Sequence, residues 1–161
     1  MSQTELVIYA DGGCKGQHSK TAEREAYCSI AAFVGDRPIT FSPDWIKEIT
    51  GLDCTESKQI LSRTLPKVST SPHAEFAAMN TAIRYIAAVI RRNTGKAMPT
   101  IKIRMDSEQV VQSFNGERKV KAKHLAALFV PAMTAFARAN DHTPVEIEWI
   151  DGDTMKSVLG H

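Results

Sequence analysis

The chain has 161 residues, of which 43% are hydrophobic and 24% are charged, and its formal net charge is +2. This composition is typical of a folded chain that forms one domain, and it excludes a disordered protein. The longest apolar runs fall well short of the roughly 20 residues that cross a bilayer, and the first residues do not read as a leader, so we expect a cytoplasmic protein with no membrane contact. Cys14, Cys28 and Cys54 form neither an even disulfide set nor a closely spaced metal-binding pair, so we expect reduced thiols.

The first half of the chain has the pattern of successive strands. The apolar run at 6–9 predicts a strand that ends at Asp11, with a turn at Gly12 and Gly13. After a polar loop, residues 27–34 predict a second strand, and residues 39–41 begin a possible third. The signal is weak between 42 and 71, where we expect an excursion at the sheet edge, with 60–65 resuming or forming the third strand.

The second half alternates helices and strands. Apolar residues recur every three or four positions from Ser71 to Gly95, which predicts a helix that Ser71 can cap. Alternation at 101–105 predicts a strand that ends at Asp106, followed by a short helix from Ser107. A helix is expected over 122–139, bent or displaced at its start by Pro131, then a strand at 145–151 and at most two turns of terminal helix. Strands followed by alternating helices and strands predict an α/β fold with a mixed sheet and helices on its faces.

Three acids are placed where such a sheet gathers reacting groups. Asp11 and Asp106 each follow a predicted strand, and Glu75 lies in the first turn of the long helix. Singly, an aspartate in a turn or a glutamate at a helix start is explained by local structure. Together, carboxylates that converge repel one another unless a cation is present, and oxygen ligands alone suit magnesium or manganese. Two such ions about 4 Å apart would stabilise the attacking water and the leaving oxygen of a phosphodiester, which predicts a nuclease.

Successive segments of the chain resemble the signature segments of type 1 ribonuclease H, in order and at fitting spacing. They are "IYADGGCKG", "HAEFAAMNTAIRYI", "IRMDSEQVVQSF" and "VEIEWIDGD". The resemblance implies a single domain over 1–161 with a five-stranded mixed sheet, in which two parallel strands follow three antiparallel strands, and with helices on both faces. Residues 43–66 match poorly and are interpreted as an insertion, and the C-terminal helix is short.

The same resemblance implies an endonuclease that cuts the RNA strand of RNA/DNA hybrids with two Mg²⁺ ions, which Mn²⁺ can replace. Asp11, Glu75 and Asp106 match the first metal-binding acids of the family. The fourth acid is expected on a C-terminal helix after a histidine, but here Asp153 stands at the histidine position. Asp153, or else Asp151, is therefore the candidate fourth ligand, and His161 is a candidate for product release or a terminal residue with no role.

Further residues match the positions at which the family contacts the hybrid. Backbone and amide groups there would read the 2′-hydroxyl that separates RNA from DNA. The basic segment "RKVKAK" resembles the region with which some members grip the DNA strand, although a solvated helix start explains it equally well. The predicted contacts are Gly12, Gly13, Cys14, Gln17, Ser71, Ser107, Gln112, Lys119 and Lys121.

Two other functions remain open from the residues alone. One is another nuclease on the same fold, such as a resolvase or an exonuclease, because the arrangement of acids alone does not identify the substrate. The other is a non-catalytic nucleic-acid-binding module that kept the fold. No obligate protein partner is indicated, and Trp45 and Trp149 are interpreted as residues that fill the core or cover the sheet.

Overall fold

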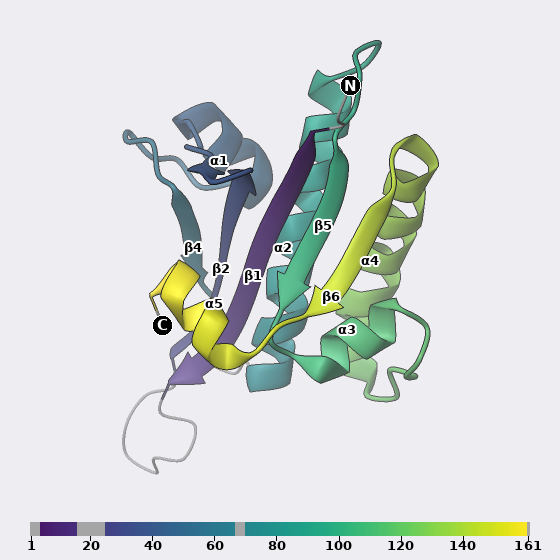
Figure 1. Cartoon of the computed structure of the whole chain (residues 1–161). Coiled ribbons are helices and arrows are strands. Elements are labelled where there is room, and N and C mark those ends of the chain that lie inside the picture. Colours follow the sequence, from purple (N-terminus) through teal and green to yellow (C-terminus); the bar gives the residue numbers. More distant parts are fainter. Residues whose placement is uncertain (1–3, 16–24, 67–69, 161) are drawn as a thin grey trace.

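The computed structural model describes residues 4–15, 25–66 and 70–160. Within that part of the chain, one sheet has six strands: β1 (Glu5–Lys15), β2 (Glu25–Val34), β3 (Arg37–Pro38), β4 (Ile60–Thr64), β5 (Thr100–Met105) and β6 (Val145–Trp149). The helices are α1 (Pro43–Thr50), α2 (Ser71–Arg92), α3 (Glu108–Phe114), α4 (Lys123–His142) and α5 (Gly152–Leu159). Figure 1 shows their arrangement.

The sheet is mixed, which confirms the α/β prediction. Its strand order is β3-β2-β1-β5-β6, with β4 also paired to β2. β1 and β2 are antiparallel, whereas β1, β5 and β6 are parallel. Two short antiparallel strands, β3 and β4, pair with successive parts of β2 and occupy the place of the expected third strand.

The insertion between β3 and β4 contains a helix that the sequence pattern did not predict. Ser42 caps α1 by accepting a hydrogen bond from the Trp45 N–H at 3.4 Å, and the helix ends at Gly51, whose φ is 76°. Both features are typical helix boundaries. A helix of eight residues is too short to show a clear apolar period in the sequence, so only these two boundary signals could have indicated it.

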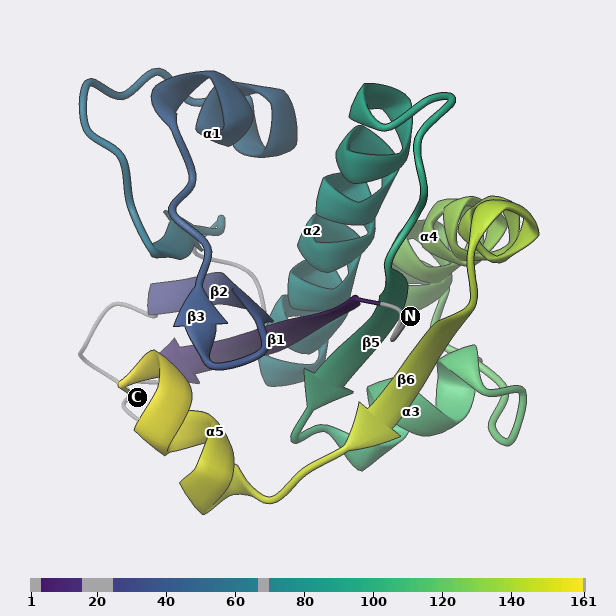
Figure 2. The same cartoon turned by 45° about the horizontal axis from the view of Figure 1, so that its top comes forward.

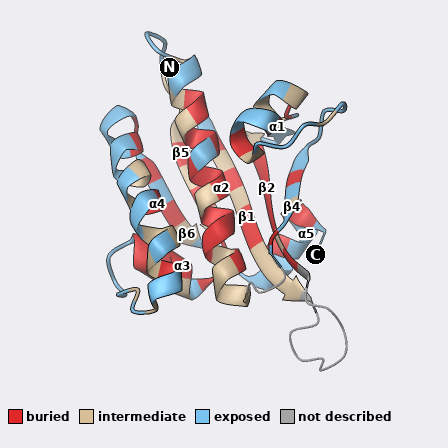
Figure 3. Cartoon of the chain, turned by 180° about the vertical axis from the view of Figure 1, so that it is seen from behind, coloured by how far each residue is buried: buried red, intermediate tan, exposed pale blue. Residues whose placement is uncertain are grey.

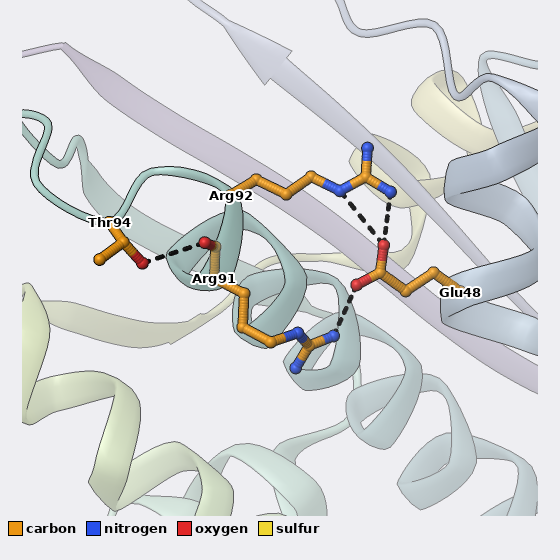
Figure 4. Close-up of polar contacts among 4 residues, drawn as sticks. All are labelled: Glu48, Arg91, Arg92 and Thr94. Carbon is orange, nitrogen blue, oxygen red and sulfur yellow. Dashed lines mark hydrogen bonds and ion pairs between the residues drawn. The ribbon is translucent and has the colours of Figure 1, made fainter.

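The end of α2 holds α1 in place through an ion-pair cluster. Both carboxylate oxygens of Glu48 accept hydrogen bonds from arginines of α2, from Arg91 Nη2 at 2.7 Å and from Arg92 Nη2 at 2.5 Å (Figure 4). The Arg92 guanidinium also lies 3.8 Å from the centre of the Trp45 ring. These contacts lie at the C-terminal end of α2, at the opposite end of this helix from Glu75.

The core lies mainly between the sheet and α2. Ile8, Ile30 and Ile103 from three strands pack with α2 residues such as Phe76 and Met79, all of them buried. Figure 3 shows α2 largely buried, while α4 has a more exposed outer side. A smaller cluster of Met155, Leu159 and Ala31 joins α5 to the sheet. Figure 2 shows α5 on the face of the sheet opposite α2. Helices therefore cover both faces, as predicted.

Several expected boundaries are wrong. β1 does not end at Asp11, because Gly12 and Gly13 continue the strand and pair with Cys28 and Tyr27 of β2. The cap of α2 is Thr70, whose hydroxyl accepts the His73 N–H at 3.4 Å, and α2 ends at Arg92, before Gly95. Pro131 lies inside α4, so it does not displace the start of that helix.

Two expectations from composition can be compared with the structure. Cys14, Cys28 and Cys54 form no disulfide, in agreement with the prediction of reduced thiols. None of the helices in the described residues is both long and apolar enough to cross a membrane.

Candidate active site

Sheet topology brings Asp11 and Asp106 together across 95 residues of sequence. β1 and β5 are parallel neighbours in which Tyr9 pairs with Arg104, so the residues that follow in each strand reach the same edge of the sheet. The side chains of Asp11 and Asp106 are hydrogen-bonded to each other. Asp11 is buried, with only 7% of its surface exposed. The acids that were predicted to converge from these two strands therefore do so.

Gly12 brings the first turn of α2 close to β1. A Cβ atom at Gly12 would lie 2.1 Å from the carbonyl oxygen of Ala74, which is far inside van der Waals contact. The φ angle of Gly12 is not positive, so the glycine is required for space and not for a turn. This close approach places Glu75, the residue after Ala74, beside the aspartate pair.

Ser107 fixes the position of Glu75. Its hydroxyl donates a hydrogen bond of 2.6 Å to Glu75 Oε2 and accepts one from the Val110 N–H at 3.3 Å. The second bond makes Ser107 the N-cap of α3. One side chain thus connects the end of β5, the start of α3 and the first turn of α2. The sequence placed Ser107 at this helix start, but only the structure shows its bond to Glu75.

Burial and mutual repulsion raise the pKa values of Asp11 and Glu75. The pKa of Asp11 is raised to about 7, first by burial, then by the charge of Asp106 and its hydrogen bond, and then by the charge of Glu75. The pKa of Glu75 is also raised, mainly by burial, although the Ser107 hydrogen bond opposes this shift. Near neutral pH a proton on Asp11 therefore relieves part of the repulsion among these carboxyl groups.

The donor set fits a hard divalent cation. Asp11, Asp106 and Glu75 offer only oxygen atoms, which magnesium and manganese prefer. Among the described residues, no three histidine, cysteine, aspartate or glutamate side chains form a preassembled metal cluster. The arrangement is a hydrogen-bonded pair with a third acid beside it, and a cation would take the place of the proton on Asp11.

Tyr27 is a neighbour of the acids that sequence reasoning missed. It pairs with Gly13 across β1 and β2, and a Cβ atom at Gly13 would lie 2.6 Å from the Tyr27 hydroxyl. Its pKa is raised by burial and by the charges of Asp11 and Asp106. A tyrosine in a strand is ordinary, so only the register between β1 and β2 could have indicated its position.

The candidates for the fourth acid lie at the start of α5. The first residue of this helix, Gly152, lies close to Asp106, since a Cβ atom there would be 3.7 Å from Asp106 Oδ2. Asp151 caps α5 by accepting the Thr154 N–H at 2.7 Å, and this bond lowers its pKa. The side chain of Asp153 is exposed and has no hydrogen bond or ion pair with another described residue. The structure therefore brings the start of α5 near Asp106 and joins neither Asp151 nor Asp153 to the other acids.

The predicted nucleic-acid contacts occupy two regions. Gly12, Gly13 and Cys14 lie on β1, and Ser71, Ser107 and Gln112 lie at the start of α2 and along α3. Lys119 and Lys121 are exposed and line a groove of about 480 Å³ with Arg118 and Gln109. Gln17 and His161 lie outside the described residues.

Trp149 does not fill the core, which was one of the two roles expected of it from the sequence. Its side chain is 48% exposed, and its indole N–H donates a hydrogen bond of 3.1 Å to the backbone oxygen of Asp106. Trp45, by contrast, packs on Tyr85 and Arg92. Strand alternation placed Trp149 on the side of Ile147, but it could not show that the core ends before this residue.

Solved structures identify the fold of the protein. The N-terminal RNase H domain of rv2228c from Mycobacterium tuberculosis matches with a TM-score of 0.64 and 18% identity, over 96% of this chain and 87% of that chain. LC11-RNase H1, solved in complex with an RNA/DNA hybrid, matches with a TM-score of 0.61 and 17% identity, over 94% of this chain and 89% of that chain. RNase H1 from the halophilic archaeon Halobacterium salinarum NRC-1 gives a TM-score of 0.58 and 15% identity, over 94% and 89% of the two chains.

These likenesses establish a ribonuclease H-like fold, as the sequence motifs predicted. No family model matches the sequence, and no curated protein matches it.

Proposed function

We propose that the protein is an endonuclease that hydrolyses the RNA strand of RNA/DNA hybrids with divalent metal ions. The observation that carries this proposal is the buried, hydrogen-bonded pair of Asp11 and Asp106, with Glu75 beside it, on a ribonuclease H-like sheet. Burying several carboxyl groups together destabilises a fold unless a ligand makes use of their charge. Such sites are therefore candidates for function.

Asp11, Glu75 and Asp106 would hold the metal, with Asp153 as the candidate for a fourth ligand and Mg²⁺, or Mn²⁺ in its place, as the ion. When bound, a pair of such ions stabilises the charge on the attacking water and on the leaving oxygen of a phosphodiester. The chain's own contribution is positioning. Ser107 donates a hydrogen bond to Oε2 of Glu75. Because Gly12 has no side chain, α2 can lie close to β1.

The substrate part of the proposal combines a likeness with the groups on this surface. LC11-RNase H1 has the same fold and was solved in complex with an RNA/DNA hybrid. On β1, α2 and α3, the elements around the acids, this chain carries the hydroxyl of Ser71, the amide of Gln112 and the backbone of Gly12, Gly13 and Cys14, groups that can read a 2′-hydroxyl. Gln17 is proposed for the same role from its sequence position. The groove of Lys119 and Lys121 supplies cations for the phosphates of the DNA strand.

A panel of end-labelled substrates of one sequence tests the function. We would compare RNA/DNA hybrid, RNA duplex, DNA duplex and a branched DNA, each with Mg²⁺, with Mn²⁺ and with a chelator. The proposal expects internal cuts in the RNA strand of the hybrid, which the chelator abolishes. Preferential cutting of branched DNA, or removal of nucleotides only from an end, would assign the fold to a resolvase or an exonuclease. Binding without any cleavage would assign it to a non-catalytic module.

A further inference from the structure

Trp149 combines exposure with a fixed orientation at the edge of the candidate site. It is the last residue of β6 and pairs with Met105, the residue before Asp106. Among the described residues it is the sole aromatic side chain in the group of exposed large hydrophobic residues, and its exposed fraction is 48%. Its N–H bonds to the Asp106 carbonyl at 3.1 Å, so the ring is tied to the backbone of an acid of the site.

That hydrogen bond separates Trp149 from an ordinary exposed apolar residue. Isolated hydrophobic side chains are common on protein surfaces and need no special explanation. An exposed tryptophan can instead pack its ring on the protein surface and donate its N–H to water. Here the protein itself accepts the N–H, and about half of the side chain remains open to a ligand.

β6, which ends at Trp149, lies next to β5 in the sheet and packs against α3, a helix that contributes to the basic groove. Across the sheet the order is β1 with Asp11, β5 followed by Asp106, and β6 with Trp149. α3 packs next to β6, where Asn115 Nδ2 donates to the Ile147 carbonyl at 3.2 Å. Gln109 of α3 lines the groove that contains Lys119 and Lys121. The acids, Trp149 and the groove therefore lie on neighbouring elements.

We propose that Trp149 is a nucleic-acid contact whose ring stacks on a base or sugar of the strand bound beside Asp106. The inference rests on the proposed function and adds a residue to it. Every base has a π face, so stacking on an aromatic side chain strengthens binding without reading sequence. The ring therefore contributes to substrate affinity, whereas the acids carry the chemistry.

Binding is measured without cleavage in an Asp11→Asn background, with a fluorescent RNA/DNA hybrid and anisotropy as the readout. Trp149→Leu removes the aromatic ring but keeps an apolar side chain, and we expect it to weaken hybrid binding by roughly 5- to 100-fold. Trp149→Phe keeps a ring without the N–H, and we expect it to retain affinity within about threefold of the parent. Circular dichroism and thermal melting check that each variant is folded.

A second readout uses the natural fluorescence of the chain, which has two tryptophans. Trp45→Phe leaves Trp149 as the only emitter, and Trp45 lies on α1, away from the acids. Stacking predicts that the hybrid quenches this emission at saturation, and that unlabelled hybrid titrates with the same affinity as in the anisotropy measurement. An unchanged spectrum at saturation would contradict stacking even if Trp149→Leu failed to fold.

The outcomes separate this inference from the proposed function. If the parent binds hybrid and Trp149→Leu, folded, binds it equally well, the inference is wrong and the proposed function stands. A loss in Trp149→Phe as large as that in Trp149→Leu would show that the N–H to Asp106 matters instead of the ring, which also overturns stacking. If the parent protein binds no nucleic acid, both proposals fail.

Discussion

Gly12 of β1 and Ala74 of α2 approach so closely that no side chain fits between them. A Cβ atom at position 12 would lie 2.1 Å from the Ala74 carbonyl oxygen. Because Asp11 and Glu75 flank these residues, the spacing between β1 and α2 also sets the spacing between their carboxyl groups. The backbone contact is therefore part of the candidate active site.

Gly12→Ala tests that relationship. The added methyl group has to push β1 away from α2, which we expect to cost about 1–3 kcal/mol of unfolding free energy. It should also lower hybrid cleavage by roughly 100-fold, since small displacements of reacting groups have large effects on rate. Urea denaturation and cleavage assays measure the two effects.

Gly13→Ala is the matched control for stability. Its methyl group would meet the end of the Tyr27 side chain, which can move, whereas Gly12→Ala would meet backbone. We therefore expect a smaller loss of unfolding free energy at position 13. Equal losses of unfolding free energy at the two positions would show that the backbone contact between Gly12 and Ala74 is no more restrictive than the side-chain contact at Gly13.

Ser107→Ala removes the hydroxyl that joins α3 to Glu75. Loss of the N-cap should cost about 1 kcal/mol of unfolding free energy. Loss of the hydrogen bond to the Glu75 carboxylate should lower kcat about tenfold, because the acid is no longer held in place. Ser107→Thr keeps both the cap and the donor, so it should recover most of the activity. If alanine and threonine gave the same kcat, Ser107 would have only a structural role.

The raised pKa of Asp11 predicts how stability depends on pH in metal-free protein. This carboxyl titrates near 3.8 when unfolded and at about 7 when folded, so the folded state holds more protons between these values. The unfolding free energy should therefore fall as pH rises from about 4 to about 7. Mg²⁺ should restore stability at neutral pH, because a ligand that binds only the folded state stabilises it.

Melting temperatures at pH 5 and pH 8, with chelator and with Mg²⁺, measure this effect. Asp11→Asn removes the titrating group, so its melting temperature should change less between the two pH values and should respond less to Mg²⁺. A parent protein that is more stable at pH 8 than at pH 5 in chelator would contradict the account of the acid cluster.

The basic groove predicts a salt effect that does not depend on substrate sequence. Lys119→Ala and Lys121→Ala each remove one cation from its lining. Each should weaken hybrid binding and reduce the slope of log K against log salt by about 1, because one fewer counterion is released. Unchanged slopes in both variants would show that these lysines form only a solvated helix start.

Parts of the fold could be predicted because their signals are local or periodic. The helix from Ser71 has apolar residues every three or four positions, and the alternation at 101–105 placed Asp106 at the end of β5. The motif around Asp11, Glu75 and Asp106 pointed to the correct class of fold. These signals depend on neighbouring residues, which the sequence displays directly.

Other features depend on contacts between distant segments and could not be predicted. Gly12 was interpreted as a turn residue, because the sequence does not show the backbone of Ala74 beside it. α1 is short, and its place depends on Glu48 meeting arginines more than forty residues away. Trp149 was expected to fill the core or to cover the sheet, because the sequence does not show that the residues packed over β6 leave its last residue exposed.

Hybrid cleavage as a function of Mg²⁺ concentration tests the central claim most directly. The parent is compared with Asp11→Asn, Glu75→Gln and Asp106→Asn, and with Glu48→Gln, which removes a carboxylate that pairs with Arg91 and Arg92 at the other end of α2. We predict that each of the first three variants loses about a thousandfold or more in rate at saturating Mg²⁺, while Glu48→Gln cleaves as the parent does. Cleavage by Asp11→Asn at the rate of the parent would contradict a metal site built on these acids.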